Sequence, residues 1–338
     1  MTDIKTLLDA LVRAPGVSGA EGPAADVASG LLAGADWINI SPLGSVVAQL
    51  APPVEGKPNL LLTAHLDQIG LVVTHEAANG FVRVSCVGGV DRRMAAGARV
   101  EIQTPDGPVP GVVTSTPPHL QDGEPKLPGA QMLVDLGGQP EGGCLPRPGM
   151  PGRFVLEPAE LLNGRYTAPA LDNRAGCASV IAAGLDLAAK KPGFGVFVVL
   201  TSTEETGGAG GATAAYGLGV THAVVVDVTM GATGFEAPHK TGKMGGGPMI
   251  GFAPALSYDF ALALEGLAQV QDIPVQREVM AGGTGTDSEH IAKSCGGVKT
   301  VLLSIPIRFM HTPAETVVVQ DIIDTARLMV AIGEETLC

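Results

Sequence analysis

The sequence predicts an α/β protein with a mixed, mostly parallel sheet flanked by helices and a small all-β domain inserted into it. From Leu171 onward, apolar runs of strand length alternate with segments of helical spacing. Continuous apolar strands of this kind occur in sheets that are covered on both faces. Between residues 81 and 158, short strand-like runs are instead separated by prolines and glycines. This pattern of short strands separated by turn residues indicates an all-β unit.

The N-terminal segment predicts two helices followed by two strands. The leucines within residues 7–11 share one helical face, and Pro15 ends this helix. A second, alanine-rich helix is expected after Glu21. Strands are predicted at 44–50 and 59–67, where apolar residues form short continuous runs.

The middle of the chain predicts the inserted domain. Asp106-Gly107 lies between two strand-like runs and is a hairpin signal. We therefore expect a main domain made of residues 1–69 and 164–338, and a β-rich insertion of residues 70–163 that serves oligomerisation or substrate access. The strands expected within the insertion are 81–87, 98–104, 108–114, 131–137 and 152–158.

The C-terminal half predicts alternating strands and helices. Asp172 stands before the first helix, where its carboxylate would act as the N-cap. The expected helices are 173–191, 211–219, 258–271, 288–295 and 317–335. The expected strands are 193–202, 221–229, 274–280 and 299–308.

Composition excludes several classes of protein. Hydrophobic residues make up 45% of the 338 residues and charged residues 16%, which is typical of a globular chain. A net charge of −13 without a basic stripe argues against nucleic-acid binding. No apolar run predicts a membrane span or a signal peptide. Five scattered cysteines without C-x-x-C spacing fit a reducing compartment, so we expect a cytoplasmic protein without a membrane partner.

Polar side chains gather where the predicted strands end. The carboxyl ends of strands in an open α/β sheet meet in one crevice, where ligands bind. Two histidines and several acids at such positions form an inventory of metal ligands. These residues are His65, Asp67, Asp172, Glu204, Glu205, Asp227 and His311.

Local spacing suggests roles for two pairs of these residues. Residues two apart on a strand point the same way, so Asp67 would hold the second ring nitrogen of His65. Adjacent residues on a strand point to opposite sides. Glu205 would therefore ligate a metal while Glu204 stays off it and faces bound water.

Eight stretches of the sequence form a distinctive set: APGVSGAEG, AHLDQIGLVV, GGVDRRMAAGARV, GVVTSTPPHL, ALDNRAG, STEETG, GGTGTDSEHIA and IPIRFMHTPAE. In these stretches the chain resembles the tetrahedral (glutamyl or deblocking) aminopeptidase family of dinuclear metallopeptidases. The resemblance covers nearly the whole length, in family order, and implies a zinc aminopeptidase-like fold.

The resemblance implies two divalent metal ions per subunit, with zinc favoured and cobalt or manganese as alternatives. His65, Asp172 and Asp227 would hold one ion. Asp172, Glu205 and His311 would hold the other, so that Asp172 bridges. Glu204 would be the general base and Asp67 the partner of His65. A cis peptide bond between Asp172 and Asn173 is also implied.

The implied reaction is hydrolysis of N-terminal residues from peptides that have a free N-terminus. Two metal ions would activate a water, and Glu204 would move its proton to the leaving amine. The resemblance further implies a homo-oligomer, commonly a hollow dodecamer built from dimers.

Three rival functions follow from the same residues. A dinuclear deacylase of N-acyl amino acids or amino sugars would use the same site. A glycan hydrolase would use paired carboxylates and needs no metal. A non-enzymatic scaffold would not need this set of residues together.

Two further residues have open roles. Asp287 would meet a substrate amine or cap the helix that follows it. His119 would reach an active site across a subunit boundary or pack within its loop.

Overall fold

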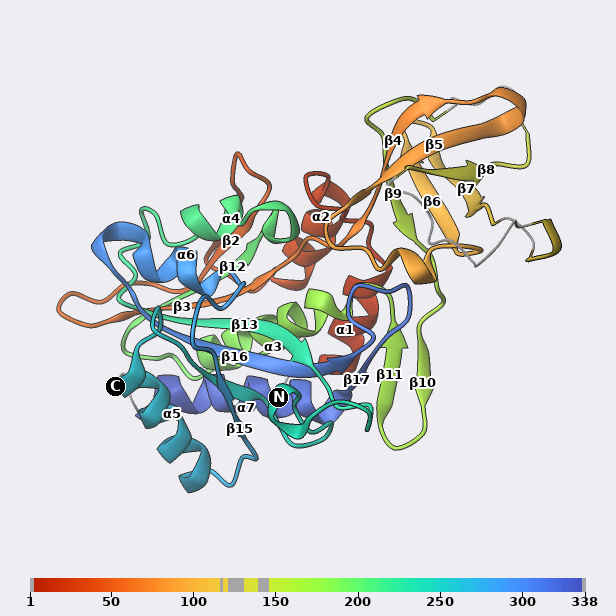
Figure 1. Cartoon of the computed structure of the whole chain (residues 1–338). Coiled ribbons are helices and arrows are strands. Elements are labelled where there is room, and N and C mark those ends of the chain that lie inside the picture. The colour runs from red at the N-terminus through yellow and green to blue at the C-terminus, as the bar shows by residue number, and fades with distance from the viewer. Residues whose placement is uncertain (1–2, 116–117, 121–130, 139–145, 336–338) are drawn as a thin grey trace.

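The computed structural model describes residues 3–115, 118–120, 131–138 and 146–335. They form a large α/β body from which a small β-barrel projects at one end (Figure 1). The barrel is joined to the body by the chain that leaves β3 and by the chain that returns after β9. This arrangement confirms the predicted fold: a mixed sheet flanked by helices, plus a separate antiparallel unit.

The large sheet has eleven strands, in the order β1-β2-β12-β3-β13-β16-β17-β11-β10, with β14 and β15 paired off this path. Its centre is parallel, because β12, β3, β13 and β16 run in the same direction. The strands are β1 (Trp37–Ile40), β2 (Val46–Ala51), β3 (Asn59–His65), β10 (Ala159–Leu161), β11 (Arg165–Ala168), β12 (Gly195–Thr201), β13 (His222–Met230), β14 (Met249–Phe252), β15 (Gln276–Val279), β16 (Lys299–Arg308) and β17 (Glu315–Val318).

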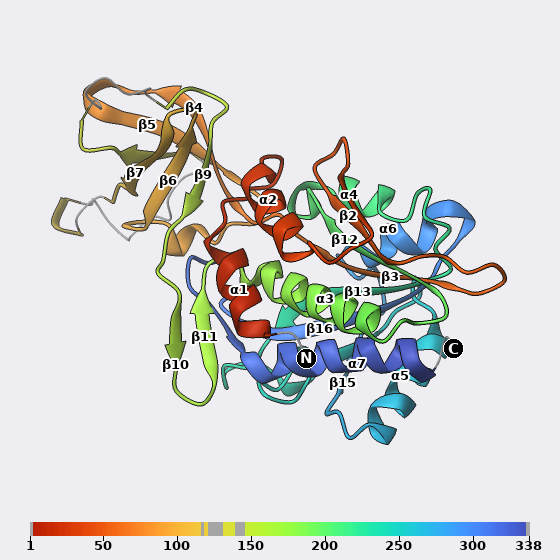
Figure 2. The same cartoon turned by 180° about the vertical axis from the view of Figure 1, so that it is seen from behind.

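Helices cover both faces of this sheet. Figure 2 shows α1, α3 and α7 on one side, where they enclose the largest apolar core together with α5. A smaller core lies on the other side, under α4 and α6. No helix in the described ranges is long and apolar enough to cross a membrane. The helices are α1 (Ile4–Arg13), α2 (Gly22–Leu31), α3 (Leu171–Ala189), α4 (Ala209–Thr213), α5 (Tyr258–Val270), α6 (Ser288–Lys293) and α7 (Val319–Glu335).

The central strands form because their sequences suit burial on both faces. Every residue of β12 is buried, and valine is its commonest residue. A strand covered on both sides needs apolar residues at every position rather than an alternating pattern. The buried strands fix the ends of β3, β12, β13 and β16 relative to one another.

The barrel closes in the order β4-β5-β8-β7-β6-β9 and has its own apolar core. Val84, Ile102 and Val134 lie fully buried inside it. Closure leaves no free sheet edge within this ring. Its strands are β4 (Gly70–Glu76), β5 (Phe81–Val87), β6 (Arg99–Thr104), β7 (Gly107–Val113), β8 (Gln131–Asp135) and β9 (Pro151–Phe154).

The prediction missed several strands. Strand β4, of seven residues, and the strands β1, β10, β11, β14 and β17, of three or four residues each, were not expected. The helix predicted at 317–335 begins at Val319, and the valines before it complete β17. Within the predicted insertion of residues 70–163, β10 pairs with β11 in the large sheet. The division of the chain into domains with these boundaries stays a prediction.

Candidate metal centre

The candidate site lies at the carboxyl edge of the parallel strands. His65 is the last residue of β3 and pairs in register with Thr201, the last residue of β12. The loops after β12 and β16 bring further side chains to the same edge. A cavity of about 600 Å³ is lined there by His65, Asp172, Glu204, Glu205, Asp227 and His311, among other residues.

The first candidate ligand group is fully buried and consists of His65, Asp172 and Asp227. His65 Nε2 lies 3.0 Å from Asp172 Oδ1 and 3.6 Å from Asp227 Oδ1. One ligand atom from each of the three residues lies within 4.8 Å of the others. Two carboxylates and an imidazole at this spacing are a donor set that suits a divalent cation.

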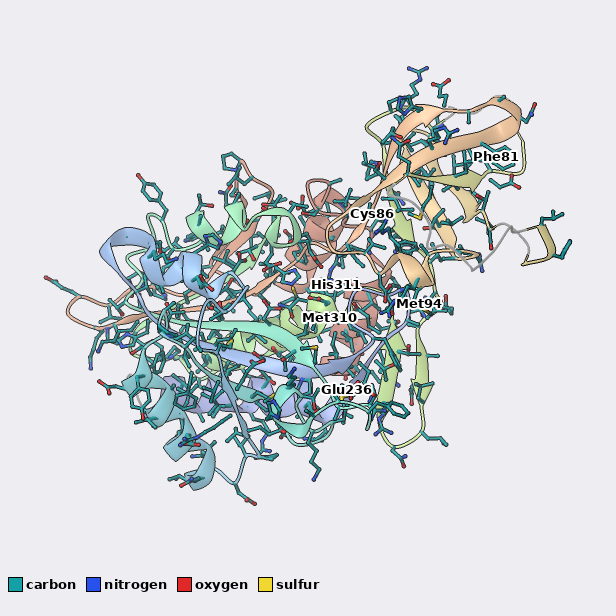
Figure 3. All side chains as sticks on the ribbon, viewed as in Figure 1. Phe81, Cys86, Met94, Glu236, Met310 and His311 are labelled. Carbon is teal, nitrogen blue, oxygen red and sulfur yellow. The ribbon has the colours of Figure 1, made fainter. Side chains whose placement is uncertain are left out.

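The second group, Asp172, Glu205 and His311, is more open. His311 Nε2 lies 3.3 Å from Asp172 Oδ2 and 3.5 Å from Glu205 Oε2. Figure 3 shows His311 and Met310 on the body, beside the base of the barrel. Asp172 belongs to both groups, with one carboxylate oxygen toward each imidazole.

Asp67 lies beneath the site and contacts more than the sequence suggested. His65 Nδ1 is 3.1 Å from the Asp67 carbonyl oxygen and 3.6 Å from its carboxylate. The carboxylate instead accepts the backbone N–H groups of Glu204 and Glu205. Because Asp67 is fully buried, it fixes both the tautomer of His65 and the position of the paired glutamates.

The paired glutamates are not on a strand. Strand β12 ends at Thr201, and Glu204 and Glu205 begin a 3-10 helical turn, η4 (Glu204–Thr206). The predicted reason for their divergence, strand alternation, is therefore wrong. Successive side chains of a 3-10 helix are about 120° apart. This spacing sends Glu205 toward Asp172 and His311, whereas Glu204 lies outside both candidate groups.

The predicted N-cap role of Asp172 is also wrong. Its carboxylate is directed to the two imidazoles, and its backbone is not helical. The next residue, Asn173, accepts the N–H of Gly176 with its side-chain oxygen, at 3.0 Å. Asn173 thus caps the first turn. The peptide bond between Asp172 and Asn173 is cis, as the resemblance implied.

Glu315 is a site residue that the sequence analysis did not single out. Its carboxylate is buried and accepts two backbone N–H groups, from Asp172 and from His311, each at 2.8 Å. One side chain therefore ties together two residues that are distant in the sequence. The signal in the sequence was weak, since Glu315 only closes the stretch that contains His311.

The backbone around the site adopts unusual conformations. Ala170, Thr203 and His311 have positive φ angles of 60°, 55° and 63°. Such angles are uncommon for residues with a Cβ and persist where surrounding contacts hold them. Next to the barrel, a Cβ on Gly89 would lie 2.7 Å from the His311 ring. Glycine is thus required where the barrel-side chain meets His311.

Burial and mutual proximity shift the proton affinities of the site. Burial, with the neighbouring carboxylates, raises the pKa of Glu204 to about 8. Burial and the charge of Asp172 raise the pKa of Glu205 to about 7. The hydrogen bond that the His311 ring donates to the Asp172 carboxylate raises the pKa of His311 to about 9, against the effect of burial. Carboxylates that resist ionisation at this spacing mark a place where a cation would stabilise them.

One atom of the site also fits a cation directly. Glu205 Oε1 is buried and has no hydrogen-bond partner among the described residues. A buried carboxylate oxygen without a partner is costly, and a metal ion is one group that satisfies it. The donor set therefore fits the divalent ions that the resemblance implies.

Two other predicted candidates lie elsewhere. Asp287 is buried, accepts the Thr201 hydroxyl at 2.5 Å and makes no side-chain cap to α6. It does not line the cavity. His119 is exposed on a short 3-10 turn of the barrel region and is not part of the cavity lining.

The parallel sheet edge and its two carboxylate–imidazole groups define a metal-dependent hydrolase. The chain belongs to the M42 glutamyl aminopeptidase family, whose model matches residues 44–328. It is accordingly a metal-dependent aminopeptidase, an enzyme that hydrolyses peptide bonds. The family resemblance drawn from the sequence is confirmed.

Known proteins similar to this chain support the assignment. A lysyl aminopeptidase of Pyrococcus furiosus is 30% identical over 97% of this chain and 96% of its own length. A solved TET1 peptidase of Pyrococcus horikoshii, described as assembling into a tetrahedron or an octahedral shell, has a TM-score of 0.85 at 27% identity, covering 98% of this chain and 99% of its own. A Thermotoga maritima structure named as an endoglucanase has a TM-score of 0.76 at 27% identity, covering 97% of each chain.

Proposed function

We propose that this aminopeptidase works with two divalent metal ions per subunit. His65, Asp172 and Asp227 hold one ion, and Asp172, Glu205 and His311 hold the other. The sharing of Asp172 between both groups is the observation that carries this proposal. When bound, such an ion pair supplies Lewis-acid activation of a water and of the scissile carbonyl.

Glu204 is the general base of the proposed reaction. It lines the cavity but belongs to neither ligand group, so its carboxylate stays available for a proton. Glu204 takes a proton from the attacking water and passes it to the leaving amine. Asp67 holds the backbone N–H of Glu204 at 3.0 Å and thereby sets its position.

Imidazole and carboxylate ligands suit zinc, cobalt and manganese. Zinc is the favoured metal, and cobalt and manganese are the alternatives. The substrates are peptides with a free N-terminus. The assembly is a homo-oligomer, by analogy with the TET1 peptidase that forms a closed shell, and a dodecamer built from dimers is the form proposed. A cytoplasmic location stays a prediction.

The test of this function is the Glu204→Gln variant. Its metal content should match that of the wild-type enzyme, because Glu204 lies outside both ligand groups. Turnover of an aminoacyl-anilide should fall by about 10²–10⁴-fold, the usual contribution of a general base. Metal content by plasma mass spectrometry and steady-state kinetics would measure both.

Full activity of the Glu204→Gln variant would remove this residue from the mechanism. The Glu205→Ala variant is the matched comparison, since it alters the adjacent residue of the same turn. It should lose metal as well as activity.

The similarity to a structure named as an endoglucanase keeps glycan hydrolysis as the second candidate. Paired carboxylates that cleave glycosides need no metal. Cellulose oligomer hydrolysis that survives chelator treatment would favour that candidate. Release of amino acids from free but not from N-acylated peptides would separate an aminopeptidase from a deacylase.

A further inference from the structure

The cavity is lined by apolar residues as well as by the candidate metal ligands. Its lining includes three methionines, Met230, Met280 and Met310, together with Leu302, and we call these four residues the methionine wall. Methionine side chains are flexible and adapt to irregular apolar groups. This wall would accommodate the apolar stem of a long side chain.

One carboxylate stands in this wall, apart from the ligand groups. Glu278 lies on β15, lines the cavity and accepts the Thr229 hydroxyl at 2.5 Å through Oε1. Thr229 is two residues beyond Asp227 on β13, and residues two apart on a strand lie about 6.5 Å apart on the same face. Glu278 therefore contacts β13 two residues beyond Asp227, the candidate ligand on that strand.

Glu278 has no ion-pair partner within the described structure, but Lys240 and Arg277 line an adjoining cavity that shares Glu278 with this one. Its neighbour Arg277 is bound to Glu265, at 2.5 and 2.6 Å. No lysine or arginine is present among the described residues of the cavity lining. No described basic side chain forms an ion pair with Glu278.

The proposed metal ions would not bind Glu278, because it belongs to neither ligand group. Five carboxylates line the cavity. Two divalent cations carry four positive charges, so one negative charge of the lining would remain. The other four carboxylates of the lining are those of Asp172, Glu204, Glu205 and Asp227.

We propose that Glu278 selects substrates whose N-terminal residue is lysine or arginine. The inference rests on the proposed aminopeptidase mechanism and adds the substrate class. The stem of a basic residue would lie along the methionines while its cationic end meets the free oxygen of Glu278. Lysine and arginine bury their stems and keep the charged end hydrated in this way. An N-terminal glutamate would be repelled.

The test compares N-terminal residues of similar length and different charge. Lysyl, norleucyl and glutamyl p-nitroanilides would be assayed with the wild-type enzyme and with the Glu278→Gln variant. For the wild-type enzyme, kcat/KM should fall in the order lysine, norleucine, glutamate. The Glu278→Gln variant should lower the ratio of the lysyl to the norleucyl value by about tenfold, the effect of one charged hydrogen bond in a partly exposed site.

A binding measurement separates recognition from turnover. Calorimetric titration with free lysine should give weaker binding to the Glu278→Gln variant than to wild type, with no such difference for free norleucine. The matched control is Glu236→Gln, because Glu236 also accepts a threonine hydroxyl, from Thr233, but is exposed and outside the cavity. It should keep the wild-type ratio of lysyl to norleucyl hydrolysis.

The outcomes distinguish this inference from the function on which it rests. Wild-type hydrolysis of norleucyl-anilide at least as fast as of lysyl-anilide would overturn the role of Glu278 and leave the aminopeptidase function standing. An equal ratio for wild type and Glu278→Gln would do the same. If the enzyme cleaved none of the three anilides, the proposed aminopeptidase function would instead be wrong.

Discussion

The two candidate ligand groups share Asp172 but differ in how they are built. His65, in the first group, has a side chain only 2% exposed, whereas the side chain of His311 is 33% exposed. The first group comes from the strands β3 and β13 and from the start of the helix α3, all of which are buried. The second depends on loops that follow β12 and β16.

This difference shows two ways to hold a ligand in place. Strand pairing fixes the first group, because His65 and Asp227 lie on neighbouring parallel strands. The second group has no strand pairing at His311. The backbone of that residue is held instead by Glu315, which accepts its N–H, and by Asp91, whose N–H donates to its carbonyl at 2.9 Å. We therefore expect the second group to be the more easily disturbed.

The largest effect is expected from Asp172→Ala, which breaks both groups at once. The variant should lose both metal ions, because Asp172 is shared. Turnover should then fall by about 10³-fold or more, since the nucleophilic water depends on the ions. Metal analysis and anilide kinetics would measure this. Retention of one tightly held ion would show that one group holds its ion without the shared carboxylate.

A smaller effect is expected from His311→Ala, because this substitution removes a ligand of the second group only. The more open second group should lose its ion, so the metal-to-subunit ratio should fall from about two to about one. The buried first group should keep its ion in dilute chelator. The control is His222→Ala, at the opposite end of β13 from the site. Loss of both ions from the His311→Ala variant would contradict the expectation that the buried first group keeps its ion without His311.

The smallest effect is expected from Glu315→Gln, which leaves every ligand in place. The carboxylate accepts one N–H at each oxygen. In the amide one of these oxygens is replaced by an NH2 group, which cannot accept, so either Asp172 or His311 loses its backbone restraint. Metal affinity should fall by about 10–100-fold, which is typical when a supporting hydrogen bond is removed. Competition with a chromophoric chelator would measure it.

Asp321→Asn is a close control for that experiment. Asp321 is also a fully buried carboxylate that accepts two backbone N–H groups, from Gly245 and Gly247, each at 2.8 Å. It lies outside the cavity lining. Both variants should lower the melting temperature, but metal affinity should fall only for Glu315→Gln. Equal metal affinities would make Glu315 a purely structural residue.

Much of the fold was predictable because apolar residues recur in the sequence with strong strand or helix periodicity. The long buried strands and the helices α3, α5 and α7 were predicted from apolar spacing. Short strands such as β10 and β17 were not, because three or four residues carry too little periodicity to be distinguished from loops. Strand β10 forms as a hairpin with β11, which follows it in the chain, whereas β17 pairs with the distant β11 as well as with β16.

The site residues were predictable as chemistry but not as geometry. Strand-end histidines and acids selected the residues that now line the cavity. The turn that carries Glu204 and Glu205 was assigned to the wrong secondary structure, and Asn173 rather than Asp172 caps α3. Glu278 and Glu315 were missed, because their contacts are to residues 49 and 143 positions away.

The sequence by itself determined the layered α/β architecture, the inserted β unit and the kinds of side chain available to bind a metal. These follow from local spacing and residue chemistry. Tertiary structure alone decided that Asp172 faces two imidazoles, that Glu315 ties His311 to Asp172, and that Glu278 lines the same cavity as the methionine wall. Each of those facts depends on the register of strands far apart in the chain, which no local pattern encodes.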